Sequence, residues 1–160
     1  MRKPVPKTST PRELLIVALQ DLHDAERAWT ERGPGFCSLV GNELRGFLNA
    51  DLARSAAQAE ELEAILSLLD AGIGGDPNIW LRAILDDADR DSKSIVEGPL
   101  LDTALIGAFR KGKQAERVSY ETAVALATQL DLPVVSKQLS EICSQESIAD
   151  RELYRLLEAR

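Results

Sequence analysis

Residues 11–32 read PRELLIVALQDLHDAERAWTER, and this stretch decides how the fold begins. Its large apolar side chains recur every three or four positions, which is the period of an α-helix with one buried face. These side chains are Leu15, Leu19, Leu22 and Trp29. Thr10 is suited to cap the helix, Pro11 to open it, and Glu13 completes a Thr-x-x-Glu capping box. We therefore predict a helix over residues 11–32 behind a flexible tail, residues 1–10.

The rest of the chain repeats the helical period between glycine and proline breaks. Further helices are predicted at residues 43–71, 77–88, 100–130 and 132–158, with the short one starting at Asp76-Pro77. No stretch shows sustained alternation of apolar and polar residues, so we predict no strands. Four long helices and a short crossover helix indicate an all-α, ferritin-like four-helix bundle over residues 11–160.

The bulk composition excludes several classes of protein. The 160 residues suit one domain, and 44% hydrophobic with 28% charged residues is typical of a globular chain. A net charge of −7 disfavours nucleic acid as a partner. No apolar run approaches the roughly 20 residues of a membrane helix, and no secretory signal is present, so we expect a cytoplasmic protein. Cys37 and Cys143 are expected to be reduced thiols. Neither belongs to a Cys-x-x-Cys pair and His23 is the sole histidine, which argues against a Cys/His zinc site.

Three predicted helices each carry a glutamate on their apolar row. Glu26 follows Leu22 in the first helix, Glu116 lies on the row of the third long helix, and Glu146 lies on that of the last. Asp150 follows Glu146 by one turn. One such glutamate is unremarkable, because it can reach solvent at the edge of the row. Three at matching depth indicate a buried carboxylate cluster, as in bundles that bind two metal ions, with Fe and Mn suited to such ligands.

Cationic side chains stand where such a metal site would need more ligands. The second predicted helix offers Asp51 and Arg54, and the third long helix offers Lys113 one turn before Glu116. Each cation is either solvated or directed at the carboxylates, and in the second case it would neutralise them and oppose metal entry. If Arg54 compensates buried carboxylates, we expect Arg54→Ala to cost on the order of 3 kcal/mol.

At these residues the chain resembles the YciF-type ferritin-like family of bacterial stress-associated proteins. The resemblance runs from Leu14 onward. It rests on an opening signature at Leu19–Glu26, Pro34, Glu43-Leu44-Arg45, Gln58 with Leu62-Glu63, Asp102–Ile106, Glu116 with Tyr120, and Glu146 with Asp150. Each motif is weak alone, but their order and spacing together are specific. The resemblance implies a ferritin-like fold, a dimetal site and a homodimer, with Glu26, Glu116, Glu146 and Asp150 as its acidic residues.

The chain departs from this family at two motifs. The His-x-x-Glu of the family's second helix stands here as Asp51-Leu52-Ala53-Arg54. The Glu-His-Tyr-Glu of its third helix stands as Lys113-Gln114-Ala115-Glu116. The metal-binding residue types are therefore absent at these positions.

Our leading hypothesis is a structural or interaction protein of the stress response with no catalytic residue and no bound metal. Its dimetal site would be replaced by buried salt bridges among Glu26, Asp51, Arg54, Lys113, Glu116, Glu146 and Asp150. We expect a homodimer, with no nucleic acid or membrane partner; the sequence does not identify a protein partner. The alternative is a di-iron or di-manganese oxidoreductase acting on peroxide or oxygen, in which Asp51 compensates for the lost ligands.

Overall fold

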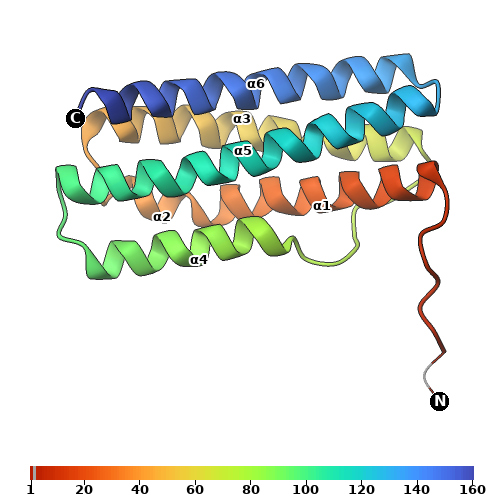
Figure 1. Cartoon of the computed structure of the whole chain (residues 1–160), viewed down its shortest axis with the longest axis horizontal. Helices are drawn as coiled ribbons and strands as arrows, with labels where there is room; N and C mark the ends of the chain where they lie inside the picture. Colours follow the sequence, from red (N-terminus) through yellow and green to blue (C-terminus); the bar gives the residue numbers. More distant parts are fainter. Residues whose placement is uncertain (2) are drawn as a thin grey trace.

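The structure is a computed structural model that describes residues 1 and 3–160, and its regular elements are all helices. They are α1 (Pro11–Arg32), α2 (Pro34–Cys37), α3 (Asn42–Leu68), α4 (Ile79–Ser94), α5 (Pro99–Gln129) and α6 (Pro133–Glu158). The long helices α1, α3, α5 and α6 run side by side, and α4 packs on α1 and α5 (Figure 1). The described residues contain no strand, so the all-α prediction is confirmed.

The start of α1 follows the predicted capping. Thr10 Oγ1 accepts a hydrogen bond from the Glu13 backbone N–H at 3.1 Å. The Glu13 carboxylate accepts a hydrogen bond from the Ser9 backbone N–H at 2.8 Å. Both bonds fix the direction in which the chain enters the helix. Residues 3–9 form no regular element, and Arg2 of the predicted tail lies outside the described residues.

The Gly33-Pro34 break separates α1 from α2, as the sequence indicates. A Cβ atom on Gly33 would lie 2.5 Å from Leu52 Cδ2 and 2.6 Å from the Trp29 carbonyl oxygen. Only glycine fits this close approach of α1 to α3. The short α2 then turns the chain into α3.

Two helices end earlier than predicted, and both ends have the same geometry. Asp70 and Asp131 adopt a left-handed backbone conformation, each with a φ of 54°. One residue later, the N–H of Ala71 bonds back to the Leu66 carbonyl at 2.9 Å, which satisfies a terminal acceptor. The left-handed aspartate, rather than the glycine-rich segment after it, therefore terminates α3.

The prediction for the short helix was wrong at both ends, since α4 spans Ile79–Ser94 rather than residues 77–88. Its cap is Asn78, whose Oδ1 accepts from the Leu81 N–H at 2.8 Å, so Asp76-Pro77 stays outside the helix. At the other end the helix continues past Ala88, where Lys93 bonds Asp89 one turn earlier at 2.7 Å. Such pairs support a helix until the next glycine-proline break.

The core consists of two apolar clusters with a polar layer between them. The first cluster includes Leu48, Leu105 and Phe109, and the second includes Leu22, Leu62 and Tyr120. Each long helix passes from one cluster to the other at a buried polar residue. These residues are Glu26 on α1, Asp51, Ser55 and Gln58 on α3, Lys113 and Glu116 on α5, and Glu146 on α6. None of the described helices is long and apolar enough to cross a bilayer.

Candidate functional site

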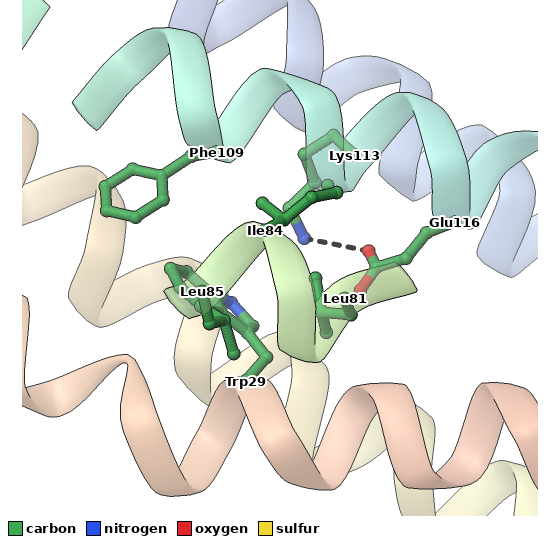
Figure 2. A pocket seen from close by; sticks show the side chains of 8 residues that line it. Trp29, Leu81, Ile84, Leu85, Phe109, Lys113 and Glu116 are labelled. Carbon is green, nitrogen blue, oxygen red and sulfur yellow. Dashed lines mark hydrogen bonds and ion pairs between the residues drawn. The ribbon is translucent and has the colours of Figure 1, made fainter. Parts of the chain in front are cut away.

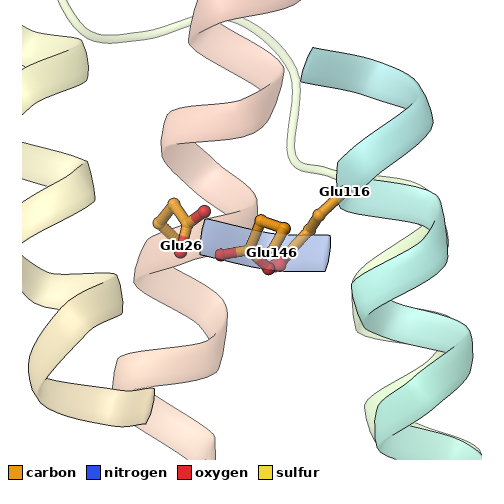
Figure 3. Close-up of side chains that lie close together, drawn as sticks. All are labelled: Glu26, Glu116 and Glu146. Atoms are coloured by element: carbon orange, nitrogen blue, oxygen red, sulfur yellow. The ribbon is translucent and has the colours of Figure 1, made fainter. Parts of the chain in front are cut away.

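The three glutamates that the sequence places on apolar rows meet in the polar layer. Glu26, Glu116 and Glu146 come from α1, α5 and α6, and each is almost completely buried. One carboxylate oxygen from each lies within 4.8 Å of the others (Figure 3). The helical period sets this convergence, because each glutamate replaces an apolar residue on the core-facing side of its helix.

Both oxygens of Glu26 have hydrogen-bond donors. Tyr120 donates its hydroxyl to Glu26 Oε1 at 2.9 Å, and Ser55 donates to Oε2. Burial, followed by the nearby charge of Glu146, raises the pKa of Glu26 to about 8. This raised pKa favours the protonated form of Glu26 at neutral pH.

Lys113 is the cation at the centre of the layer. Its ammonium lies 2.8 Å from Asp51 Oδ2, 2.9 Å from Glu146 Oε2 and 3.3 Å from Glu116 Oε2, and the side chain is 4% exposed. The contacts to Glu146 and Glu116 are hydrogen bonds, and the contact to Asp51 is an ion pair. Burial alone would lower the pKa of Lys113, but the surrounding carboxylates outweigh burial and raise it well above its ordinary value.

The two glutamates nearest Lys113 differ in their acidity. Burial, followed by the charge of Glu146, raises the pKa of Glu116 well above its ordinary value. Burial acts in the same direction on Glu146, but the charge of Lys113 together with hydrogen bonds from neighbouring side chains outweighs it, and the pKa of Glu146 is lowered. Glu146 is therefore the ionised partner of Lys113, and Glu116 favours the protonated form.

Asp51 joins the cluster from α3 and is held by donors from three directions. Trp29 Nε1 donates to Asp51 Oδ2 at 2.8 Å, and the Arg54 guanidinium donates to Oδ1 at 3.0 Å. Lys113 supplies the third contact. Arg54 is 28% exposed and touches Asp51 rather than the three glutamates. The structure thus brings Lys113 to the centre of the cluster and Arg54 to its edge.

Asp150 forms a separate network near the surface. It accepts from Arg110 Nε at 2.8 Å, Arg110 Nη2 at 3.1 Å and Gln114 Nε2 at 2.7 Å. The hydrogen bond that Arg110 donates to Asp150 raises the pKa of Arg110, whose guanidinium also stacks 4.7 Å above the Tyr154 ring. The Asp150 contacts among the described residues do not include the central carboxylates.

Sequence reasoning missed the hydrogen-bonding roles of Trp29, Ser55 and Tyr120. All three lie on apolar rows, where a polar atom must find a partner once buried. That rule signals that a partner exists, but it does not identify the partner. Gln58 also belongs to the layer, and its Nε2 donates to Gln145 Oε1 at 3.0 Å.

An apolar pocket reaches the cluster from the side of α4. Figure 2 shows Leu81, Ile84 and Leu85 of α4 facing Lys113 and Glu116. A Cβ on Gly112 would lie 3.2 Å from Leu81 Cδ1, so the α4 side chains pack closely on α5. The short helix therefore covers the Lys113 side of the cluster with hydrocarbon, which strengthens the electrostatic interactions inside.

The sole histidine does not contribute to the cluster. His23 lies on α1, and its Nε2 is 2.8 Å from Glu63 Oε1 of α3. The donor set at the three-glutamate site is therefore carboxylate, hydroxyl and ammonium. Both cysteines are free thiols and only partly buried.

Comparison with known proteins identifies the fold. A domain of unknown function, DUF892, matches residues 10–160. Among solved structures, the Escherichia coli stress protein YciF is similar with a TM-score of 0.89 at 24% identity, over 94% of this chain and 96% of that one. YcfI from Rhodopseudomonas palustris is similar with a TM-score of 0.89 at 22% identity, over 95% and 98%. A search of curated proteins finds no match.

A more distant similarity reaches ferritin-like, diiron-carboxylate proteins from Bacillus anthracis. The TM-score is 0.73 at 16% identity, over 94% of this chain and 99% of that one. The predicted ferritin-like fold and the predicted resemblance to YciF-type proteins are both confirmed.

Proposed function

Because the chain belongs to the DUF892 family, we propose that it is a ferritin-like structural or interaction protein of the stress response without a two-metal centre. E. coli YciF is described as a stress protein, and that description supports the stress association. One observation carries the proposal. The Lys113 ammonium lies 2.8 to 3.3 Å from three carboxylates, two of which belong to the three-glutamate group, so it supplies positive charge of the kind that a metal ion would bring.

The donor set does not fit a pair of metal ions. Two-metal bundles use inward carboxylates together with Glu-x-x-His pairs, whereas His23 is bound to Glu63 outside the cluster. The positive charge of Lys113 repels a second cation within the same low-dielectric space. A metal ion could bind only by displacing the Lys113 ammonium from its carboxylates. The ammonium therefore opposes metal entry in two ways: it repels the cation, and it competes with it for the same carboxylate oxygens.

The alternative is a di-iron or di-manganese oxidoreductase acting on peroxide or oxygen. The convergence of three carboxylates within 4.8 Å favours it. That hypothesis requires Asp51 to replace the lost ligands. Asp51 instead accepts from Trp29 and contacts both Arg54 and Lys113, so its oxygens are already engaged. This engagement supports the structural role.

The resemblance to YciF-type proteins also leads us to propose a cytoplasmic homodimer. The formal charge of −7 disfavours a nucleic-acid partner. Sedimentation equilibrium over a range of protein concentrations would measure the mass in solution. A mass equal to one chain at all concentrations would contradict the dimer without affecting the proposed role of Lys113.

Metal analysis of protein from cells grown with iron and manganese tests the proposed function. We expect no stoichiometric pair of ions in the purified chain. Two ions per chain, retained through gel filtration, would overturn the proposal and favour the oxidoreductase.

A charge reversal at Lys113 gives an independent test. Lys113→Glu places a fourth carboxylate beside Asp51, Glu116 and Glu146, so we expect it to be less stable than the parent and to be stabilised by Mn²⁺. Lys111→Glu is the matched control, because it makes the same charge change at an exposed position of α5. A Mn²⁺-dependent melting midpoint in the parent or in the control would contradict the proposal.

A further inference from the structure

A shallow groove on the surface has apolar walls and no occupant among the described residues. One wall comes from α1 and the other from the α3–α4 connection and the start of α4. The apolar lining consists of Leu14, Val17, Ala18, Pro77, Ile79 and Trp80. Ile79 is 82% exposed and Leu14 and Val17 are about half exposed, so this surface lacks the packing that apolar side chains normally obtain.

The groove also carries two acidic groups without a cationic partner. Asp21 and Asp76 line it, and neither forms an ion pair within residues 1 and 3–160. Asp21 Oδ2 accepts from Trp80 Nε1 at 3.3 Å, which fixes the indole in the wall. An apolar channel with an aromatic wall and acidic groups fits a proline-containing, basic segment, because such segments dock in polyproline II form.

The chain contains one segment with this chemistry. Residues 3–7 read Lys-Pro-Val-Pro-Lys, so two prolines flank an apolar residue and two lysines flank the prolines. Val5 is 87% exposed, and neither Lys3 nor Lys7 forms an ion pair with any described residue. The segment and the groove therefore complement each other in both apolar surface and charge.

The entry into α1 directs the segment toward the groove. Ser9 is bonded to the Glu13 carboxylate, and Glu13, Val17 and Asp21 follow one another at intervals of four residues on one face of α1. The tail therefore leaves α1 on the side that forms the groove wall. In Figure 1 it extends from the bundle on the same side as α4.

The lengths of the segment and the groove are comparable. The α1 wall from Leu14 to Asp21 measures about 10 Å at the helical rise. Residues 3–7 span about 12 Å as a polyproline II strand. Residues 7–9 can reach about 10 Å, enough to reverse direction at the helix start.

We propose that this groove is a binding site for a basic, proline-containing segment and that residues 3–7 of the same chain dock in it. Val5 packs against the apolar walls, and the lysines approach Asp21 and Asp76. In the structure Val5 is exposed outside the groove, so docking requires the tail to fold back along α1. A partner with a similar segment would compete with the tail for the same surface.

Fluorine NMR of protein labelled with 5-fluorotryptophan tests the proposal. The chain has two tryptophans, of which Trp80 lines the groove and Trp29 lies in the core. We expect Val5→Asp to shift the Trp80 resonance and leave that of Trp29 unchanged. Val96→Asp is the matched control, because Val96 is similarly exposed but lies in the α4–α5 connection. An unchanged Trp80 resonance in Val5→Asp would overturn the proposal.

Adding a peptide of residues 1–9 to the Val5→Asp variant tests the groove as a binding site independently of the variant's own tail. We expect saturable return of the Trp80 resonance to its parent position, and absence of binding would overturn the proposed site. Lys7→Glu in the peptide should weaken binding about two- to five-fold, as expected for an exposed ion pair, and Asp76→Lys in the protein should restore it. A parent Trp80 resonance that depends on protein concentration would overturn docking within one chain, because it indicates exchange between two copies.

Discussion

The Lys113 cluster and the Arg110–Asp150 network both join α5 and α6, but they differ in burial. Lys113 is 4% exposed and is surrounded by carboxylates, whereas Arg110 is 29% exposed and pairs with Asp150 at the edge of the bundle. Exposed ion pairs contribute little to stability because water competes with them. Removing one partner of a buried ion pair is strongly destabilising, because the remaining charge is left buried without a counter-charge. The difference shows that the same type of contact can be dispensable or essential, depending on its depth.

Replacing Lys113 should have the largest effect. Lys113→Met keeps the length of the side chain but leaves Asp51 and Glu146 without their buried cation. We expect the free energy of unfolding to fall by about 3–5 kcal/mol at neutral pH, measured by urea denaturation. Lys111→Met, at an exposed site, should change it by less than about 0.5 kcal/mol. Equal losses of stability in Lys113→Met and Lys111→Met would mean that the buried Lys113 contributes no more than an exposed lysine.

The acidity of Glu26 predicts a pH dependence. Between its ordinary value of 4.5 and its folded pKa of about 8, the folded state holds a proton that the unfolded state releases. Stability from this group is therefore full below pH 4.5 and is lost as the pH rises through 8, by at most about 1.4 kcal/mol per pH unit. Glu26→Gln should reduce this slope in urea titrations at pH 6, 7 and 8.

The control for Glu26→Gln is Glu61→Gln, at an exposed position of α3. It should retain the slope of the parent. If Glu26→Gln has the parent's slope as well, Glu26 is ionised in the folded protein, and the cluster contains more negative charge than we infer.

Arg54→Ala should have an intermediate effect of about 1–2 kcal/mol, because Arg54 makes one hydrogen bond to a charged group at the edge of the cluster. This is less than the roughly 3 kcal/mol expected for an Arg54 that neutralises buried carboxylates. Thermal and urea melts would measure it. A loss as large as that of Lys113→Met would mean that Arg54 shares the central role.

Arg110→Ala should have the smallest effect, at or below about 1 kcal/mol. The salt bridge to Asp150 is partly exposed, and Gln114 remains as a donor to that carboxylate. Added salt should reduce the effect further, since it screens exposed charges more than buried ones. A double-mutant cycle with Asp150→Asn would measure the coupling, and a value above about 2 kcal/mol would place this pair with the buried cluster.

Several features of the fold follow from local sequence. The apolar period and the capping at Thr10 define α1, and the glycine-proline pairs separate the other helices. We predicted the start of α4 two residues too early. Asn78 caps this helix, and its own backbone N–H is held by Asp24 of α1, to which it donates at 2.6 Å. That contact joins residues 54 positions apart, so local patterns do not encode it.

The sequence by itself determined that the chain is a helical bundle and that Glu26, Glu116 and Glu146 face its interior, because the helical period assigns each residue to one side of its helix. It also identified two cations, Arg54 and Lys113, that could neutralise them. Only the tertiary structure decided between the two, placing Lys113 among the carboxylates and Arg54 beside Asp51 alone. The physical reason is that helix rotation and side-chain reach depend on the packing of all the helices together, which no single helix specifies.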